Sequence, residues 1–539
     1  MGCMMQSSIR TAAVLSLLAA SAFSVQGADL PQPYPAPERG ARLTPPIGKA
    51  PSINGARVVG STPGKPFLFR IPVSGERPLK IEAKGLPKGL SLDASTGIIA
   101  GKLENAGSFT VEVSASNKHG KDTKDLVIDG NGRLSLTPPM GWNSWYSYSE
   151  AVSQEGMLKI ARLMDSSGMA DHGWTYINID DCWQGARTGP NRALQANERF
   201  PDMKAMCDEI HSLGLKAGLY SSPWMGTYAG FIGGSAPNEE GDYSAYAIPA
   251  EQRKQAHQIY GSFPGAHKAG AQKTGAVWMF DRDAKQWGEW GFDYVKTDWK
   301  PNDVPQTARI RKDLDASSRD IVLSLSNAAP MQNMPELSRL AQCTRSTGDI
   351  LDTWDSISHI GFSQEPWQKF VSPGHWCDPD MLQVGMIGTP NQANTTFRPT
   401  RLTPDEQYTQ VSLWCLLSAP LLISSDLSQI DAFTQGLLMN DDMIAVNQDR
   451  MGASARRAVD RDGVQVWAKP LSDGSLAVGF FNTNGDVREA AVTMEELGLQ
   501  PSRQYKVRDL WKRADVGSAS DKLRVMVNPH GATVFKLMP

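Results

Sequence analysis

The feature that most constrains the fold is a regular alternation of short apolar runs and longer amphipathic runs after Pro138. A strand, a helix and then another strand predict a parallel sheet, because parallel strands need a long crossover connection. Eight short runs have the composition of strands, at residues 140–145, 174–180, 215–221, 294–298, 321–326, 344–349, 374–380 and 421–425. Helical patterns fill most of the gaps. Eight such units in about 300 residues predict an α/β fold, and within that class a (β/α)8 barrel.

Two of the predicted helices carry specific signals. The first has an apolar stripe at helical spacing, formed by Met203, Met206, Ile210 and Leu213. We expect this stripe to face the core rather than a ligand. The second begins with Thr403-Pro-Asp-Glu406, which is a capping box with Pro at the first helical position.

Regions on both sides of the predicted barrel have the pattern of antiparallel β-structure. Residues 51–130 alternate between apolar and polar positions around turn-rich segments, and so does the sequence after residue 451. The stretch 85–120 resembles the Ig-like modules attached to exported bacterial enzymes, which usually act as spacers. The expected segments are a signal peptide (1–27), a linker (28–50), an N-terminal Ig-like β-sandwich (51–130), the barrel (134–450) and a C-terminal antiparallel β-sandwich (451–539).

The first residues resemble a secretory signal. Arg10 precedes a short apolar run at residues 12–18, and small residues follow up to Ala28. The apolar run is short for a membrane span, which needs about 20 residues. We therefore expect cleavage near Ala28, a periplasmic or secreted bacterial protein, and no membrane attachment after cleavage.

The composition excludes several classes of protein. Lys and Arg total 54 against 57 Asp and Glu, and this balance excludes a dedicated nucleic-acid binder. The six Cys include no C-x-x-C pair and no His and Cys cluster marks a ligand set, so we expect no metal and no cofactor. The 15 Trp suit either large aromatic cores or the apolar faces of sugar rings.

Polar residues collect at the carboxyl ends of the predicted strands, which form the catalytic face of a barrel. They are Asp180, Asp181, Lys296, Asp298, Arg345, Asp349, Asp378 and Asp380. Lys296 and Asp298 are two residues apart and share one side of their strand, where the ammonium favours the ionised carboxylate that a nucleophile needs. Two carboxylates on different strands make a glycosidase pair, and their separation decides between retention and inversion. Any single Asp could instead cap the following helix.

Several motifs between residues 134 and 452 resemble the family 27 glycoside hydrolases, the α-galactosidases and α-N-acetylgalactosaminidases. They begin with Thr137-Pro-Pro-Met-Gly-Trp-Asn-Ser-Trp145 and Tyr176-Ile-Asn-Ile-Asp-Asp-Cys-Trp183. They continue with Tyr294-Val-Lys-Thr-Asp298, Arg345-x-x-x-Asp349 and His375-Trp-Cys-Asp-Pro-Asp-Met-Leu382. The resemblance implies a barrel followed by a β-domain, and an enzyme that acts on terminal α-galactosides.

The resemblance also implies roles for individual residues. Asp298 is expected to be the nucleophile and Asp349 the general acid/base. The residues expected to bind the sugar are Asp180, Asp181, Lys296 and Arg345, and those expected to form the pocket wall are Trp145, Tyr220, Asp380 and Met381. The first two aspartates would hydrogen-bond the 4- and 6-hydroxyls of a galacto-configured ring, and the arginine would lie near the 2-position. A gluco-configured sugar would leave those carboxylates unpaired, which is costly.

The chain departs from the family's disulfide pattern. Trp299 follows the nucleophile where members often have a Cys, and Tyr228 stands at the place of its partner. Cys182 matches a bonded Cys of the family, but no Cys follows the first strand to pair with it. We expect few or no disulfides, and the alternative is a pair such as Cys343 with Cys377.

The fifth predicted strand, Leu323-Ser-Leu-Ser326-Asn-Ala-Ala329, governs which substituent fits at the 2-position of the sugar. In the family, bulky residues there leave room only for a hydroxyl, whereas Ser and Ala admit an N-acetyl group. Ser326 and Ala329 fall near the discriminating places and favour N-acetylgalactosamine, while Asn327 could fill the space or contact the 2-substituent. Galactose remains the default expectation.

The stretch 235–276 is an insertion relative to a minimal family member. It follows the third predicted strand, so we expect it to overhang the active-site mouth. It narrows the site toward chain-end residues, shapes the leaving-group subsite, or is a peripheral elaboration.

The leading hypothesis is an exported, retaining exo-glycosidase that removes terminal α-linked galactose from oligo- or polysaccharides by double displacement. An α-N-acetylgalactosaminidase is the alternative within the same class. A carbohydrate-binding protein that has lost catalysis is an alternative from another class, and the presence of both carboxylates and Lys296 argues against it.

Overall fold

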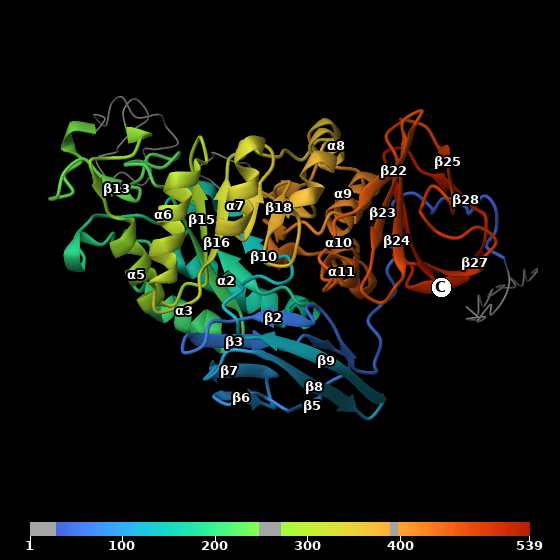
Figure 1. Cartoon of the computed structure of the whole chain (residues 1–539), viewed down its shortest axis with the longest axis horizontal. Helices are drawn as coiled ribbons and strands as arrows, with labels where there is room; N and C mark the ends of the chain where they lie inside the picture. The colour runs from blue at the N-terminus through green and yellow to red at the C-terminus, as the bar shows by residue number, and fades with distance from the viewer. Residues whose placement is uncertain (1–28, 247–270, 389–396) are drawn as a thin grey trace, which may run out of the picture.

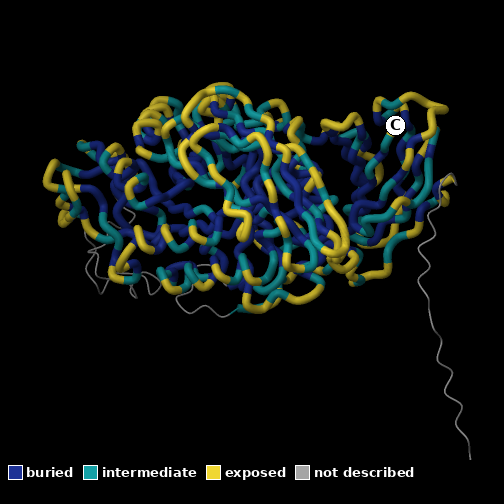
Figure 2. The backbone as a smooth tube through the Cα atoms, turned by 90° about the horizontal axis from the view of Figure 1, so that it is seen from below, coloured by how far each residue is buried: buried dark blue, intermediate teal, exposed yellow. Residues whose placement is uncertain are grey.

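The computed structural model describes residues 29–246, 271–388 and 397–539, and these form three packed parts (Figure 1). An N-terminal β-module lies below the barrel in that view, and a C-terminal β-domain lies at its right. The expected signal peptide at residues 1–27 lies outside the described residues. Buried backbone runs through the interior of each part, and the exposed stretches are mainly loops (Figure 2).

The central part is a (β/α)8 barrel, as the alternation of strands and helices predicted. Its parallel strands are β10 (Met140–Asn143), β11 (Tyr176–Asn178), β12 (Lys216–Ser221), β15 (Tyr294–Asp298), β16 (Val322–Ser326), β17 (Cys343–Arg345), β18 (Trp376–Asp378) and β21 (Leu421–Ile423). They pair in the order β18-β17-β16-β15-β12-β11-β10-β21. A parallel bridge between Leu382 and Ile423 links the segment after β18 to β21 and closes the circle.

The barrel helices begin where local capping chemistry allows them to. They include α2 (Gln154–Ser166), α3 (Met203–Ser212), α5 (Phe280–Trp290), α6 (Val304–Asp315), α7 (Met334–Leu340), α8 (Trp354–Phe362), α9 (Pro404–Leu416), α10 (Ala432–Leu438) and α11 (Asp441–Asn447). The expected capping box starts α9, with Glu406 N donating to Thr403 Oγ1 (3.3 Å) and Thr403 N donating to Glu406 Oε2 (2.7 Å). Most of the expected apolar stripe of α3 is buried, including Met206 and Ile210, whereas Leu213 after the helix is partly buried.

The two flanking parts are mainly antiparallel β-structures with separate cores, and the N-terminal module includes one parallel pair, β2 with β9. The N-terminal module has β1 (Ser52–Ile53), β2 (Val58–Gly60), β3 (Pro66–Arg70), β4 (Val73–Ser74), β5 (Lys80–Lys84), β6 (Leu90–Asp93), β7 (Ile98–Lys102), β8 (Ser108–Asn117) and β9 (Gly120–Asp129). The C-terminal domain has β22 (Arg456–Arg461), β23 (Val464–Pro470), β24 (Leu476–Asn482), β25 (Arg488–Thr493), β26 (Tyr505–Asp509), β27 (Ala514–Ala519), β28 (Lys522–Val527) and β29 (Ala532–Met538). A six-stranded sheet and the β25–β28 pair make up the latter.

The N-terminal module docks on the end of the barrel opposite the carboxyl ends of the strands. Its Thr62 N donates to Asp320 Oδ2 (2.7 Å), just before β16, and its Arg70 donates to Leu213 O (3.0 Å), just before β12. Its Asn54 donates to Asp171 O (3.0 Å), before β11. The module therefore supports the amino-terminal face of the barrel and lies away from the catalytic face.

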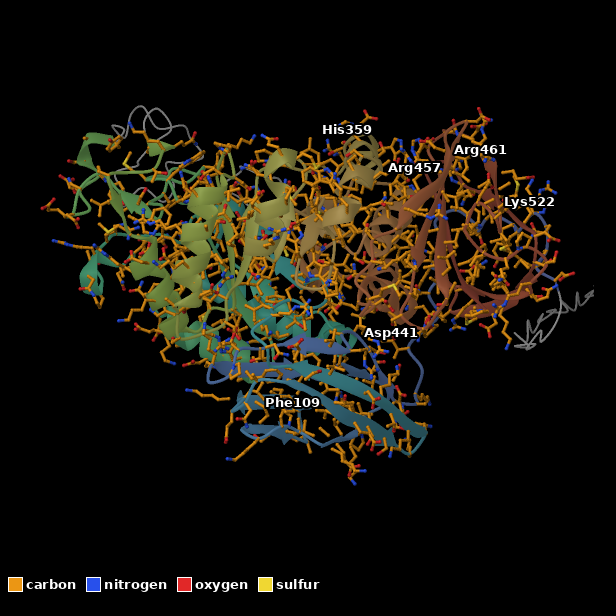
Figure 3. All side chains as sticks on the ribbon, viewed as in Figure 1. Phe109, His359, Asp441, Arg457, Arg461 and Lys522 are labelled. Carbon is orange, nitrogen blue, oxygen red and sulfur yellow. The ribbon has the colours of Figure 1, made fainter. Side chains whose placement is uncertain are left out.

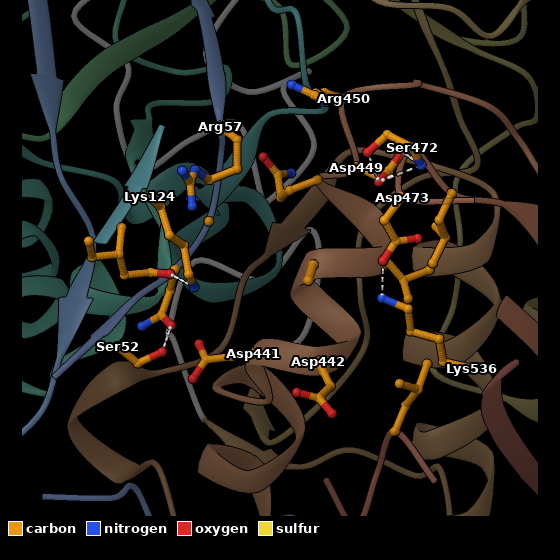
Figure 4. A pocket seen from close by; sticks show the side chains of 18 of the residues that line it. Ser52, Arg57, Lys124, Asp441, Asp442, Asp449, Arg450, Ser472, Asp473 and Lys536 are labelled. Carbon is orange, nitrogen blue, oxygen red and sulfur yellow. Dashed lines mark hydrogen bonds and ion pairs between the residues drawn. The ribbon is translucent and has the colours of Figure 1, made fainter. Parts of the chain in front are cut away.

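A cavity of about 500 Å³ lies where the module, the barrel and the C-terminal domain meet (Figure 4). Its lining is charged, and Figure 3 shows Asp441 at this three-way junction. Arg508 of the C-terminal domain pairs with Asp442 of α11 at 2.6 Å, and Lys536 pairs with Asp473 at 2.6 Å. The first pair ties the C-terminal domain to the end of the barrel, and the second lies within the C-terminal domain.

The first part of the segment expected to be a linker packs against the C-terminal domain, and its later part contacts α9 and α10 of the barrel. Asp29 and Tyr34 form parallel bridges with Ser518 and Val525, and the hydroxyl of Tyr34 donates to Asp509 (3.0 Å). Leu30 is buried in the same core. Residues 29–34 therefore pack along the C-terminal domain.

The aromatic residues of the strand-end motifs build the core. Trp142, Trp183, Trp299 and Trp376 are each 0% exposed, so they serve packing rather than sugar stacking. The described cysteines, Cys182, Cys207, Cys343, Cys377 and Cys415, are all buried and free, which confirms the expectation of few or no disulfides. Among the residues that the structure describes, no helix is both long and apolar enough to cross a membrane.

Candidate active site

The residues singled out from the sequence gather at the carboxyl ends of the barrel strands. Tyr220, Lys296 and Asp298 lie on β12 and β15, Ser326 and Arg345 end β16 and β17, and the others follow directly in the adjoining loops. Hydrogen bonds and ion pairs join most of them into one cluster, because parallel strands place their carboxyl ends at the same face. The structure thus brings together residues that are far apart in the sequence, from Asn143 to Asp380.

The carboxylate of Asp298 is buried and held at both oxygens. The hydroxyl of Tyr220 donates to Oδ2 (3.1 Å), and the amide of Asn327 donates to Oδ1. Burial raises the pKa of Asp298 to about 6, although the Lys296 ammonium acts in the opposite direction. The charge of Asp349 adds to the increase, so the two carboxylates are close enough to affect one another.

The ion pair of Lys296 is with Asp180, while its charge also favours the ionised form of Asp298, as expected. Its Nζ lies 2.8 Å from Asp180 Oδ2, and Asn143 donates to the same oxygen at 2.8 Å. Burial opposes the charge of Lys296, but Asp180 and then Asp298 outweigh it, so the pKa of Lys296 is raised. The ammonium therefore acts on Asp298 through space, and its ion pair fixes Asp180.

Arg345 organises the opposite side of the site. Its Nη2 lies 3.1 Å from both Asp349 Oδ1 and Asp380 Oδ2, and its Nη1 donates to Ser326 Oγ (3.4 Å). The side chain of Asp349 is 67% exposed, whereas that of Arg345 is 4% exposed. Arg345 outweighs the desolvation of the site and lowers the pKa of Asp349. Asp349 thus presents an accessible carboxylate at the mouth.

Asp180 and Asp181 are oriented by backbone and side-chain donors. Ser144 Oγ accepts from Asp180 N (2.8 Å), which fixes the turn after β11. Ala229 N and Cys182 N donate to the two oxygens of Asp181, at 3.0 and 2.8 Å. Burial raises the pKa of Asp181 to about 7 against these donors. The paired carboxylates form a rigid acceptor surface for hydroxyl groups.

The remaining wall residues lie where the sequence motifs place them. Tyr220 is 1% exposed and lies under Lys296, whose Nζ is 5.3 Å from the ring centroid. Met381 and Ala329 are each 5% exposed, and Trp145 is partly buried at the start of α1 (Trp145–Tyr148). The backbone N–H of Ala329 donates to Arg345 O (2.9 Å), which fixes the loop after β16 beside β17.

Two residues of the site were not assigned these roles from the sequence. Asn327 binds the nucleophile candidate, although the sequence had suggested a contact with the 2-substituent. Tyr228 is half-buried, and burial together with the charges of Asp298 and Asp349 raises its pKa. The only signal for Tyr228 in the sequence was its position where family members often have a disulfide-bonded Cys. In place of a disulfide, Tyr228 makes an aromatic contact with Trp224, with 5.5 Å between the ring centroids.

The insertion joins the wall of the catalytic face through its described ends. β13 (Ser235–Ala236) pairs with β14 (Val277–Trp278), and the hydroxyl of Tyr243 donates to Ser235 O (2.7 Å). The expectation that the insertion narrows the site concerns mainly residues 247–270, which lie outside the described residues.

A barrel with two interacting carboxylates at the carboxyl ends of different strands, beside further carboxylates that can accept from hydroxyls, defines a glycoside hydrolase. Comparison with known families agrees with this class. The model of the family described as "Alpha galactosidase A" matches residues 137–250 and 250–449. The chain belongs to this family, as its motifs predicted. Residues 461–537 match the "Alpha galactosidase C-terminal beta sandwich domain", and residues 50–129 match the "Putative Ig domain".

Individual relatives cover most of the chain. Alpha-galactosidase 2 of Arabidopsis thaliana is 31% identical over 413 residues, which are 76% of this chain and 91% of the relative. The alpha-N-acetylgalactosaminidase of Gallus gallus is 29% identical over 75% of this chain and 94% of its own length. A crystal structure from Bacteroides fragilis, described as a "putative alpha-galactosidase/melibiase", is 32% identical with a TM-score of 0.77, covering 91% of this chain and 98% of that one.

Proposed function

We propose that the protein hydrolyses terminal α-linked galactose from oligo- or polysaccharides, with retention of configuration. The observation that supports this most is the pair formed by Asp298, which ends β15, and Asp349, which follows β17, because the charge of Asp349 raises the pKa of Asp298. Asp298 is held at both oxygens and is buried, as a nucleophile must be, whereas Asp349 is exposed at the mouth, where a leaving group and water can reach it.

In the first step, an oxygen of Asp298 attacks the anomeric carbon while Asp349 gives its proton to the departing glycosidic oxygen. In the second step, Asp349 takes a proton from water, which attacks the glycosyl ester and releases Asp298. The first step needs an ionised Asp298 and a protonated Asp349. In the free protein burial raises the pKa of Asp298 and Arg345 lowers that of Asp349, so groups that favour a charge on Asp298 matter for the reaction.

Recognition of the sugar is proposed to rest on Asp180 and Asp181. Their oxygens accept hydroxyl protons, and the ion pair with Lys296 fixes the first of them. An axial 4-hydroxyl that binds both carboxylates would satisfy acceptors that an equatorial one leaves unpaired. This accounts for a galacto-configured substrate.

The experiment is hydrolysis of 4-nitrophenyl α-galactoside by the wild type, Asp298→Asn and Asp349→Asn. We expect Asp298→Asn to abolish turnover and Asp349→Asn to lower kcat by about 100- to 10,000-fold. Asp355→Asn, an exposed aspartate in the first turn of α8, is the matched control and should behave as wild type. Near-normal kcat in Asp298→Asn would contradict the nucleophile. NMR detection of the β-anomer as first product would contradict retention.

An α-N-acetylgalactosaminidase is the second candidate. Ser326 and Ala329 are small residues beside Arg345, which the family resemblance associates with the 2-position. Parallel assays with the galactoside and the N-acetylgalactosaminide separate the two activities. A higher kcat/KM on the N-acetylgalactosaminide would make it the principal substrate. Tight binding of both sugars without hydrolysis would instead support the lapsed, carbohydrate-binding alternative.

We also propose export. The support is the sequence of residues 1–27, with Arg10, a short apolar run and small residues before Ala28. Mass spectrometry of the mature protein from a bacterial periplasm or medium tests this. A mature chain that begins near Ala28 is expected, and retention of residue 10 in that material would contradict it.

A further inference from the structure

Asn327 stands at a reversal of the chain directly after β16. Asp298 and Ser326 are register partners at the ends of β15 and β16, so the residue after Ser326 begins beside the nucleophile. Asn327 and Ala328 then have positive φ angles of 66° and 40°. Non-glycine residues rarely adopt this region, and Asn tolerates it best. The turn directs the Asn327 side chain back onto Asp298, where its amide N–H donates to Oδ1.

The reversal is held in place by neighbouring groups. Asn302 Nδ2 donates to Ser326 O (3.2 Å) and to Trp299 O (2.6 Å), and so joins the ends of β15 and β16. Ala329 N donates to Arg345 O (2.9 Å) on the other side. Two consecutive left-handed residues persist only where the surroundings impose them, and such sites cluster at functional positions.

Several other groups act on the charge of Asp298. They are Lys296 on the same strand, Asp180 after β11, Tyr220 on β12, Tyr228 after β12, Arg345 on β17 and Asp349 after β17. Two of these are cations and two are carboxylates, and Lys296 is itself engaged by Asp180. A donor that binds Asp298 directly therefore has a specific effect, since a hydrogen bond to the charged form of a carboxylate favours that form.

We propose that Asn327 is a positioning residue for the nucleophile: its amide fixes Oδ1 and favours the ionised form of Asp298, which is the form that attacks the anomeric carbon. Asn327 thereby donates to one oxygen of Asp298 and Tyr220 donates to the other. This inference rests on the proposed function, because it takes Asp298 as the nucleophile.

The test uses variants that separate the amide from the backbone strain. Asn327→Gly keeps the positive φ and removes the amide. Asn327→Asp keeps the shape and replaces the donor with a second carboxylate. Ala328→Gly relieves the neighbouring strain and leaves the amide in place, so it is the matched control. Thermal melts of all four proteins establish that each is folded.

The pH profile of kcat/KM on 4-nitrophenyl α-galactoside is the main readout. In Asn327→Gly we expect the acid limb to move up by about 1–2 pH units, the size of a hydrogen bond to a charged group, with a larger effect on kcat than on KM. Asn327→Asp should move the acid limb at least as far, because a carboxylate at position 327 would repel the charge of Asp298 and raise its pKa. Ala328→Gly should superimpose on wild type. An acid limb in Asn327→Gly equal to that of wild type would overturn the inference.

A second measurement distinguishes failure of this inference from failure of the proposed function. Calorimetric binding of a cationic, galacto-configured iminosugar depends on the ionisation of Asp298 and needs no turnover. If the wild type does not hydrolyse the galactoside but the binding profile shifts in Asn327→Gly, the proposed function fails and the effect of Asn327 on Asp298 stands. If the wild type hydrolyses and both profiles are unmoved, the function stands and the inference fails.

Discussion

The buried ion pair between Arg187 and Asp283 offers a sharp test of how the catalytic face is stabilised. Nη1 and Nη2 of Arg187 each lie 2.9 Å from an oxygen of Asp283, and the two side chains are 1% and 0% exposed. Arg187 belongs to the loop after β11, and it also donates to Tyr243 (3.0 Å) and to Gly233 O in the loop after β12. Asp283 lies on α5. This ion pair therefore connects α5 with the loops after β11 and β12, which belong to the active-site mouth.

The magnitude follows from what each substitution leaves behind. Arg187→Met leaves the buried carboxylate of Asp283 without its ion-pair partner, and Asp283→Leu does the same to the buried guanidinium of Arg187. Each variant should therefore lose about 3–5 kcal/mol of unfolding free energy. The double variant leaves no uncompensated charge. We expect it to cost no more than either single variant, although independent effects would sum to about 6–10 kcal/mol.

Urea unfolding followed by Trp fluorescence measures these costs, with Trp287 of α5 close to Asp283 in sequence and 0% exposed. Because the chain has three parts, the transition of the barrel must be fitted separately. We also expect KM to rise in the single variants, since Ala229 in the loop after β12 holds Asp181. A double variant whose loss equals the sum of the single losses would refute the reasoning.

Three further predictions concern stability. Burial lowers the pKa of Lys469 from 10.5 to about 7, so between these pH values the unfolded chain binds a proton that the folded chain lacks, and stability rises with pH. Lys469→Met should flatten that rise, and melts at several pH values compare the two slopes. Thr403→Ala should lower the unfolding free energy by about 1 kcal/mol by removing the α9 cap, and an unchanged urea midpoint would contradict this. A thiol reductant should leave the melting temperature unchanged because the described cysteines are free, and a lower value would reveal a disulfide.

The positions of the strands could be predicted because their signals are local. Seven of the eight predicted strands contain an observed barrel strand, and the eighth, 344–349, overlaps β17 (Cys343–Arg345). The bounds of β15 are those predicted, and the other strands are shorter than predicted. The capping box at Thr403 was likewise predictable from four adjacent residues. The gathering of strand-end carboxylates followed from the barrel itself, since parallel strands share one carboxyl face.

The partners of the charged groups could not be predicted in the same way. Lys296 shares a strand side with Asp298, yet its ion pair is with Asp180, which follows β11, two strands away. The sequence between residues 28 and 50 has a linker's composition, yet Leu30 and Tyr34 find an apolar core on the distant C-terminal domain. In both cases the outcome depends on residues remote in the sequence.

The sequence by itself determined the barrel, the identity of its strand-end carboxylates and the family to which the chain belongs. Those features depend on periodicity, turn chemistry and motifs that a chain carries locally. Only the tertiary structure decided that Asn327 turns back onto Asp298, that Arg345 joins Asp349 to Asp380, and that the N-terminal module supports the opposite end of the barrel. These contacts depend on strand register, loop path and burial, because a side chain's partner is set by which distant groups the fold brings within hydrogen-bonding reach.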